Sequence, residues 1–217
     1  MGLKSKGENN SFIQKFPLLV TDEESVPELI IKNARRGEIK LSEGDDFTLF
    51  TNSGSGNIET DIIFAGYGLD DDCWSDYKNI DVKGKVVLIV GGSPQNKSCN
   101  LSEKDDRNHK YKIACDKGAA GILIWNAPGT RVIKGAAIRE EYYNKNVPGA
   151  YVLDWVVREL FKGTGKSFDE INNKLKFETC SFNFNKKVVF NVKMKEIKNG
   201  FGENVIGLLE GKTKKDE

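Results

Sequence analysis

The fold is decided by Lys85-Val86-Val87-Leu88-Ile89-Val90, the strongest strand pattern in the chain. Its β-branched run has no polar interruption, which favours a strand buried on both faces. A helical pattern follows from Tyr111 to Gly118, and Ile122-Leu123-Ile124-Trp125 is a second buried strand. Strand, helix and strand in this order predict a βαβ unit with a parallel strand pair and a right-handed crossover.

Other elements surround this unit and predict a mixed α/β or α+β fold. Asp105 or Asp106 is expected to cap the central helix, and Asp154 is expected to cap a short helix that ends before Gly163. Ser167 and Glu170 have the spacing of a capping box for a further helix. Further strands are expected at residues 12–16, 18–20, 30–31, 39–41, 47–49, 61–65, 147–152, 188–194 and 205–209.

The composition indicates a globular domain without a strong electrostatic field. The chain has 217 residues, of which 38% are hydrophobic and 30% charged, enough for a core under a solvated surface. Lys and Arg total 33 and Asp and Glu total 32, which gives a net charge of +1. This balance argues against nucleic acid as a partner. The apolar runs are too short to cross a bilayer, and residues 1–4 do not begin a signal peptide, so we expect no membrane insertion by this segment.

His109 is the only histidine, which removes most catalytic options. A two-zinc peptidase site needs several converging His, Asp and Glu ligands. His109 and Cys115 lie six positions apart, a rotation of about 240° on a helix, so they do not share a face. The run from Gly163 to Ser167 lacks the first glycine of a phosphate loop, because Leu160 stands there; we interpret it as the end of one helix and the cap of the next.

Two features leave alternatives open. Asp70, Asp71 and Asp72, with Asp76, form an acidic cluster that either binds calcium or is a solvated loop, and the solvated loop is favoured because no EF-hand spacing is present. The four cysteines, Cys73, Cys99, Cys115 and Cys180, allow three disulfide connectivities, and buried or free thiols are the favoured interpretation.

Three stretches in a fixed order resemble the protease-associated (PA) domain of two-zinc aminopeptidases, the family that includes glutamate carboxypeptidase and the transferrin receptor. The first runs from Ile63 through Gly66-Tyr67-Gly68, Asp76-Tyr77 and Asp81-Val82-Lys83-Gly84-Lys85 to Val87. The second is Lys112-Ile113-Ala114 followed by Lys117-Gly118-Ala119-Ala120-Gly121 and Ile122-Leu123-Ile124, and the third is Val147-Pro148-Gly149-Ala150. The residues that carry the motif, and to which we assign structural roles, are Gly66, Tyr67, Gly68, Asp76, Tyr77, Asp81, Gly84, Lys85, Gly118, Ala119, Gly121 and Pro148.

The resemblance implies a β/β/α swivelling domain with strands from a flanking peptidase domain. Residues 1–20 would be the first flanking segment, residues 21–200 the PA domain, and residues 201–217 a returning strand with a charged tail. Residues 21–60 match the family least well, so their topology is not predicted.

The resemblance also implies a function. The chain would be a non-catalytic lid, substrate-access or protein-interaction domain of an extracytoplasmic zinc aminopeptidase, with zinc held in the peptidase domain. Its partners would be that domain and a peptide or protein substrate. The loops 91–107 and 126–145 follow buried strands and are candidate walls of the substrate cleft. Arg131 and Arg139 could pair with a substrate carboxylate, against the alternative of two solvated arginines.

Two other functions are alternatives to this one. The chain could be a stand-alone module that binds peptides or proteins through the same loops. It could also be a free-standing enzyme, which the scarcity of catalytic side chains disfavours.

Overall fold

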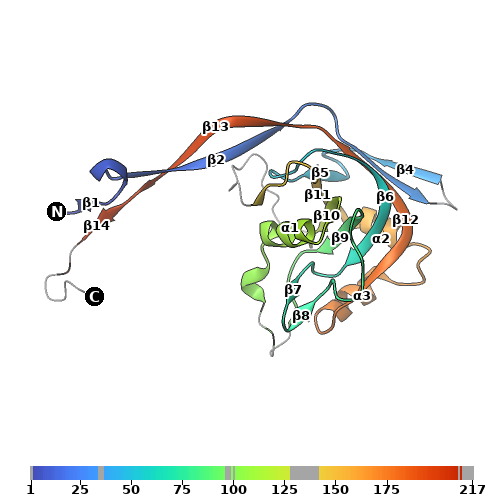
Figure 1. Ribbon diagram of the computed structural model, residues 1–217. Helices are drawn as coiled ribbons and strands as arrows, with labels where there is room; N and C mark the ends of the chain where they lie inside the picture. Colours follow the sequence, from blue (N-terminus) through green and yellow to red (C-terminus); the bar gives the residue numbers. More distant parts are fainter. Residues whose placement is uncertain are drawn as a thin grey trace.

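The computed structural model describes residues 2–33, 37–95, 99, 101–127, 142–209 and 211 (Figure 1). The strands are β1 (Lys4–Ser5), β2 (Ile13–Glu23), β3 (Glu28–Asn33), β4 (Gly37–Leu41), β5 (Phe47–Leu49), β6 (Gly56–Ala65), β7 (Asp70–Asp71), β8 (Trp74–Ser75), β9 (Val86–Val90), β10 (Gly121–Trp125), β11 (Gly149–Val152), β12 (Ser181–Val192), β13 (Met194–Val205) and β14 (Gly207–Leu208). The helices are α1 (Arg107–Asp116), α2 (Asp154–Phe161) and α3 (Phe168–Leu175), with short 3-10 turns η1 (Glu8–Asn10) and η2 (Ser102–Lys104).

Eight strands form one curved sheet in the order β4-β3-β12-β6-β9-β10-β11-β5. The four strands β6, β9, β10 and β11 are parallel, and every other neighbouring pair in this sheet is antiparallel. Strands β9 and β10 lie side by side, and α1 connects them in the sequence. The predicted βαβ unit and the mixed α/β class are therefore confirmed.

Helices cover both faces of the parallel strands. Tyr111 and Ala114 of α1 share a core cluster with Val87 and Ile89 of β9. Val86, Leu88 and Val90 belong to the opposite cluster, which also contains the apolar residues of α2 and α3. All five residues of β9 are buried, which explains why its sequence does not alternate.

The helix caps differ in part from the predictions. Asp106 caps α1 as expected, since its carboxylate accepts a hydrogen bond from the backbone N–H of His109 (3.2 Å). Asp154 is the first residue inside α2 and pairs with Arg158 (2.5 Å), so its predicted role as the cap is wrong by one position. Ser167 does occupy the N-cap position of α3, but its side chain makes no capping hydrogen bond in the described structure, so the predicted capping box is wrong.

The structure supplies the topology of residues 21–60 that the sequence left open. Strands β3 and β4 pair as a hairpin at one edge of the sheet, and β5 pairs antiparallel with β11 at the other edge. The strands expected at residues 30–31, 39–41 and 47–49 are confirmed.

At the other end of the chain, the strand expected at 188–194 begins seven residues earlier, at Ser181, because β12 pairs with both β3 and β6. The last strand is shorter than expected, because Val205 belongs to β13.

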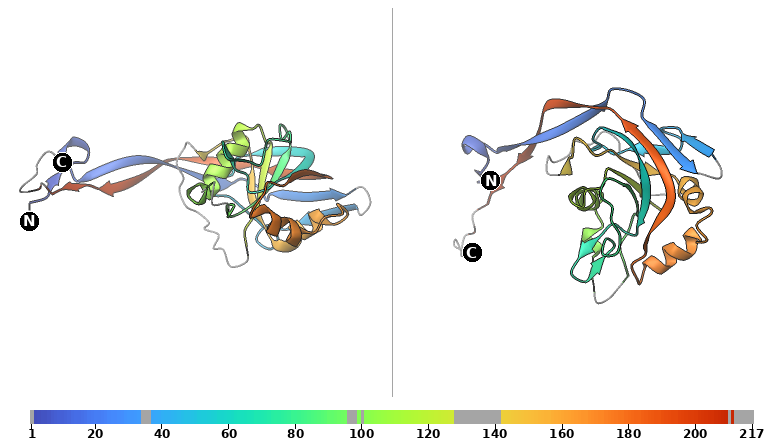
Figure 2. Two further views of the ribbon diagram at one scale, coloured as in Figure 1. Left: turned by 90° about the horizontal axis from the view of Figure 1, so that it is seen from below. Right: turned by 45° about the vertical axis from the view of Figure 1, so that its right-hand side comes forward.

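A two-stranded ribbon extends from this body. Strand β2 pairs antiparallel with β13 from Glu23 opposite Met194 to Ile13 opposite Val205, and β1 then pairs with β14. We call residues 2–23 and 194–209 the stalk. Figures 1 and 2 show that the stalk leaves the sheet at one side and carries strands β1 and β14 at its far tip. No helix in the described part of the chain is both long and apolar enough to span a bilayer.

Two of the four cysteines are joined. Cys73 and Cys99 form a disulfide, whereas Cys115 and Cys180 are free and half-buried. The interpretation of all four as buried or free thiols is therefore wrong for Cys73 and Cys99. Their sequence separation of 26 residues, without a CxxC pair, gave no local signal for this pairing.

Candidate functional site at the edges of the parallel strands

The motif residues gather at the two ends of the parallel strands. We call the side where these strands end the carboxyl edge, and the side where they begin the amino edge. Gly66, Tyr67 and Gly68 follow β6 at its carboxyl end, and Asp76 and Tyr77 lie beside them. The segments 81–85 and 118–121 meet at the amino ends of β9 and β10, where Gly84 donates a backbone hydrogen bond to the carbonyl of Gly118 (2.8 Å). Only the carboxyl edge also carries the loops that the sequence selected as candidate cleft walls.

At the carboxyl edge, a tight turn wraps around the carboxylate of Asp76. Gly66 has a φ of 49°, and a Cβ placed on it would lie 2.4 Å from Oδ1 of Asp76. The other oxygen, Oδ2, accepts hydrogen bonds from the backbone N–H of Leu69 (3.1 Å) and from Nε1 of Trp74 (3.2 Å). Glycine at position 66 therefore allows both the left-handed turn and the close approach of the carboxylate.

Asp76 is 2% exposed, and this burial raises the pKa of its carboxyl group to about 6. The hydrogen bonds from Leu69 and Trp74, and the charge of Lys110, act in the opposite direction and limit the rise in pKa. Burial likewise raises the pKa of Tyr67, whose ring lies 5.6 Å from the ammonium of Lys110, and that of Tyr77. Desolvation is therefore the main cause of the pKa shifts of Asp76, Tyr67 and Tyr77.

An ion pair between the buried Lys110 and the exposed Asp105 holds the start of the loop after β9. Lys110 of α1 is 1% exposed, and its Nζ lies 2.7 Å from Oδ1 of Asp105 and donates to the carbonyl of Gly92. The same Asp105 oxygen accepts a hydrogen bond from the N–H of Gly92 (2.9 Å). Both backbone polar groups of Gly92 are thus bound, and the pKa of Lys110 is lowered mainly by its burial. This ion pair fixes where the loop leaves the sheet.

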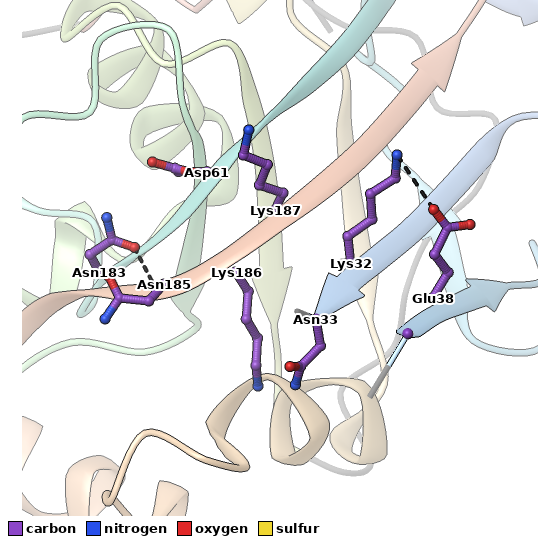
Figure 3. Close-up of a pocket in the computed structure, with 9 residues that line it drawn as sticks. Lys32, Asn33, Glu38, Asp61, Asn183, Asn185, Lys186 and Lys187 are labelled. Carbon is purple, nitrogen blue, oxygen red and sulfur yellow. Dashed lines mark hydrogen bonds and ion pairs between the residues drawn. The ribbon is translucent and has the colours of Figure 1, made fainter. Parts of the chain in front are cut away.

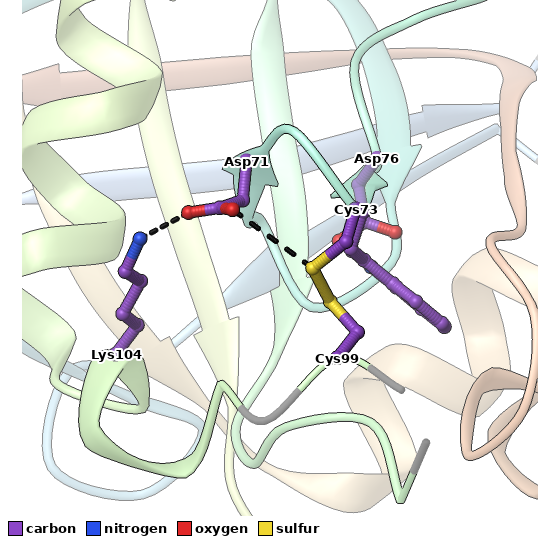
Figure 4. The surroundings of a disulfide bond; sticks show 6 residues. Asp71, Cys73, Asp76, Cys99 and Lys104 are labelled. Atoms are coloured by element: carbon purple, nitrogen blue, oxygen red, sulfur yellow. Dashed lines mark hydrogen bonds and ion pairs between the residues drawn. A yellow bond between two sulfur atoms is a disulfide. The ribbon is translucent and has the colours of Figure 1, made fainter. Parts of the chain in front are cut away.

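The disulfide and the ion pair of Asp71 with Lys104 fasten the outer side of the same edge (Figure 4). Cys73 follows β7 and is bonded to Cys99 in the loop after β9. Asp71 forms an ion pair with Lys104, and Asp70 pairs with Lys117 (2.5 Å). The pKa of each carboxyl group is lowered chiefly by its lysine. Asp70 and Asp71 are thus occupied by internal cations, which weakens the calcium alternative for the acidic cluster.

The amino edge is built from turns and small residues. Gly84 has a φ of 70°, and the pKa of Asp81 is lowered first by a hydrogen bond from the N–H of Lys83. A Cβ on Gly121 would lie 3.2 Å from both Phe190 and Val86, so glycine lets the strand pack closely there. The remaining motif residues at this edge are Lys85, whose carbonyl accepts from Ala120; Gly118, with a φ of 81°; the buried Ala119; and Pro148, whose carbonyl accepts from Ile122.

Arg131 and Arg139 lie outside the described residues, as does most of the 126–145 loop. The described ends of that loop and of the 91–107 loop leave the carboxyl ends of β10 and β9, where the sequence placed them. No group of three or more His, Cys, Asp or Glu side chains in the described ranges is arranged to hold a metal ion.

Sequence reasoning missed the two buried lysines. Lys110 lies on α1, where a polar helix face would be expected, and Lys186 lies in a strand, where its Nζ donates to the carbonyls of Glu159, Leu160 and Lys162 (2.8, 2.6 and 2.7 Å). Apolar and polar residues alternate along the start of β12, and Lys186 stands where the next apolar residue would be expected. This interruption was the available signal for the burial of Lys186. Nothing in the local sequence of Lys110 indicates its burial.

The fold and these edges define a mixed α/β domain carried on a stalk. Residues 51–154 match the sequence profile of the PA domain, so this part of the chain is a PA domain. A comparison with curated proteins finds no match.

Several solved structures are similar to this chain at low sequence identity. An aminopeptidase from Aneurinibacillus sp. strain AM-1 superposes with a TM-score of 0.50 at 16% identity, covering 94% of this chain and 39% of that chain. BSAP, a zinc aminopeptidase from Bacillus subtilis, gives 0.43 at 16% identity, with 93% and 37% covered. A peptidase M28 precursor from Shewanella amazonensis SB2B gives 0.44 at 14% identity, with 93% and 42% covered. The chain thus spans about two fifths of the length of the structures it matches.

Proposed function

We propose that this chain is the non-catalytic PA domain of a zinc-dependent aminopeptidase and acts as a lid or substrate-access domain. The observation that carries the proposal is the stalk, which brings the first and last described strands side by side. A domain inserted into another domain enters and leaves at one place, and a paired ribbon provides such a connection. The fold shared with an aminopeptidase structure is consistent with this arrangement.

The side chains of the stalk also favour a neighbouring domain. Ten large hydrophobic side chains of the described chain are exposed, and six of them belong to the stalk. Their exposed fractions are Leu3 54%, Phe12 42%, Phe201 64%, Val205 78%, Leu208 40% and Leu209 72%. A two-stranded ribbon cannot bury such side chains by itself, and exposed apolar surface of this kind marks a contact with another structure. In this proposal the peptidase domain covers them.

Catalysis belongs to that neighbouring domain. The described residues offer no arrangement that fits a zinc ion, and the ion pair of Lys110 and Asp105 already serves to hold backbone groups. In this proposal, zinc and the hydrolytic groups reside in the peptidase domain. The PA domain shapes the substrate cleft through the loops after β9 and β10. A peptide or protein is the substrate that contacts these loops.

Arg131 and Arg139 are the side chains proposed to contact a substrate carboxylate. Both belong to the loop that starts at the carboxyl end of β10, and ligands of sheets with parallel strands bind at this end. Guanidinium groups suit such a role because they bind carboxylates through two parallel hydrogen bonds.

An extracytoplasmic location is part of the proposal. Disulfides form and persist in oxidising compartments, and Cys73 and Cys99 are joined. The alternative function is a stand-alone module that binds a peptide or protein through the same loops. The exposed apolar residues of the stalk favour the attached domain over this alternative.

Peptidase assays on two samples test the proposal. The 217-residue chain with added zinc should hydrolyse an aminoacyl p-nitroanilide no faster than zinc alone. The complete natural polypeptide that carries this chain should hydrolyse it, and a chelator should abolish that activity. Chelator-sensitive turnover by the 217-residue chain would overturn the non-catalytic assignment, and a complete polypeptide without peptidase activity would favour the stand-alone module.

A further inference from the structure

A pocket of about 570 Å³ lies between the loop that joins α2 to α3 and the irregular part of β12. We call it the lysine pocket. It is lined by Asn33, Lys162, Gly163, Thr164, Lys166, Phe182, Asn183, Phe184, Asn185 and Lys186. Three of these residues are lysines, three are asparagines, and none carries a carboxylate. The whole chain has a net charge of +1, so this excess of positive charge is a local property of the pocket lining.

The three lysines contribute in different ways. Lys186 is 6% exposed, and its ammonium group donates hydrogen bonds to three carbonyl oxygens at the end of α2. It therefore supplies positive charge to the pocket but no further hydrogen-bond donor. Lys166 lies with its Nζ 5.3 Å from the centre of the Phe182 ring. The side chain of Lys162 is 53% exposed and pairs with Glu159 (2.5 Å). Counted with Glu159, these groups carry a net charge of +2.

A β-bulge opens the pocket. The pairing of β12 with β6 is interrupted between Asn183 and Lys187, and Asn185 adopts a φ of 54°. Oδ1 of Asn183 accepts a hydrogen bond from the N–H of Asn185 (2.7 Å), which holds the bulge. Bulges of this kind re-aim side chains and are common next to binding sites.

The neighbouring residues Lys186 and Lys187 point to opposite sides of β12, as successive strand residues do. Figure 3 shows Lys186 and Asn33 pointing toward α2, whereas Lys32 and Lys187 point away from it. A second pocket of about 470 Å³ at this bulge is also lined by Glu38 and Asp61, so its charges are mixed. The lysine pocket therefore has the stronger preference for an anion.

We propose that the lysine pocket binds the phosphomonoester group of a small organic molecule. A phosphomonoester carries close to two negative charges at neutral pH, which matches the net charge of the pocket. Lys166 and Lys162 would donate hydrogen bonds to the phosphate oxygens, as lysines do in phosphate sites. The buried Lys186 would add its positive charge from the wall of the pocket. The ring of Phe182 provides an apolar surface for the body of the ligand. The site differs from a phosphate loop because no strand precedes the loop at 162–167.

Helices α2 and α3, whose connecting loop lines the pocket, lie on the side of the domain away from the stalk tip (Figures 1 and 2). The pocket would stay accessible with the stalk covered by another domain. The proposal does not rest on the proposed function, since it uses only the residues around the pocket.

Calorimetric titration of the 217-residue chain with phenyl phosphate tests the proposal at pH 7.5 and low salt. We expect saturable binding to one site, and at least tenfold weaker binding to the Lys166→Gln variant. Lys174→Gln is the matched control, because Lys174 is an exposed lysine of α3 outside the pocket and the substitution removes the same charge. Unfolding curves of both variants establish that they are folded. No saturation at millimolar phenyl phosphate, or an equal loss of affinity in both variants, would refute the site.

Two further ligands separate the contributions of phosphate and ring. Inorganic phosphate should compete with phenyl phosphate for the same site with lower affinity, because it lacks contact with Phe182. Benzoate should bind more weakly than phenyl phosphate, because it carries one charge. If benzoate binds as tightly as phenyl phosphate, the assignment to a phosphomonoester is wrong.

Discussion

Substitution of Gly66 by alanine tests whether the carboxylate of Asp76 organises the carboxyl edge of the sheet. The backbone of Gly66 has a φ of 49°, and this conformation costs a residue with a Cβ roughly 1 kcal/mol. The new Cβ would also lie 2.4 Å from Oδ1 of Asp76 and displace the carboxylate. The hydrogen bonds from Leu69 and Trp74 would then weaken, and loss of one hydrogen bond to a charged group costs roughly 2 kcal/mol. We expect Gly66→Ala to lower the free energy of unfolding by about 3 kcal/mol.

Gly84→Ala is the matched control. Gly84 has a φ of 70°, but a Cβ there would meet no atom within 4 Å, so only the backbone cost of roughly 1 kcal/mol remains. The difference between the two variants isolates the contact with Asp76. Repeating Gly66→Ala in an Asp76→Ala background should reduce its cost to that of the control, since no carboxylate is left to displace.

Equilibrium unfolding in urea, followed by tryptophan fluorescence, measures these differences. Equal costs for the alanine substitutions at positions 66 and 84 would show that Asp76 does not restrict the turn. An unchanged cost of Gly66→Ala without the Asp76 carboxylate would show the same.

Three other predictions concern the disulfide, the buried carboxyl group and the stalk. Replacing Cys73 and Cys99 with serine should lower the unfolding free energy by about 3 kcal/mol, because the bond closes a loop with a separation of 26 residues; equal urea midpoints with and without the bond would contradict this. The folded-state pKa of Asp76, about 6, lies above its ordinary value of 3.8, so ionisation costs stability as the pH rises from 4 to 6, by up to about 3 kcal/mol. Urea unfolding at several pH values should show that Asp76→Asn removes this part of the pH dependence. If the unfolding free energies of the wild type and the variant change with pH in parallel, Asp76 is not its source. Phe201→Ser should change the unfolding free energy by less than about 0.5 kcal/mol and reduce binding of a dye for exposed apolar surface, because this side chain is 64% exposed; unchanged dye binding would place the apolar surface elsewhere.

The elements that could be predicted from the sequence are those whose local pattern agrees with their environment. Strand β9 is apolar throughout because both its faces are covered, and α1 has Asp106 directly before its first turn. The βαβ unit depends only on such patterns. The capping box at Ser167 has the right residue types, but Glu170 and Ser167 do not form it, because side-chain spacing alone does not fix the geometry of a helix start.

The missed features depend on contacts between distant residues. Burial of Lys110 requires the carbonyl of Gly92 and the carboxylate of Asp105, which meet it only in the folded sheet. The disulfide likewise depends on the path of the loop after β9, and the place of β5 at the sheet edge depends on β11, about a hundred residues later. The motif residues were found by their resemblance to a family, whereas their separation into two edges follows from the parallel order of β6, β9 and β10.

The stalk has a mechanical consequence. Its two strands run antiparallel, with β1 and β14 paired at the tip, so a force that separates Lys4 from Leu208 loads the ladder one pair at a time, starting with that pair. Hydrogen bonds loaded in sequence yield at lower force than bonds loaded together. Under tension the ribbon would therefore unzip before the eight-stranded sheet is strained, and its reclosure would restore the connection with the body intact.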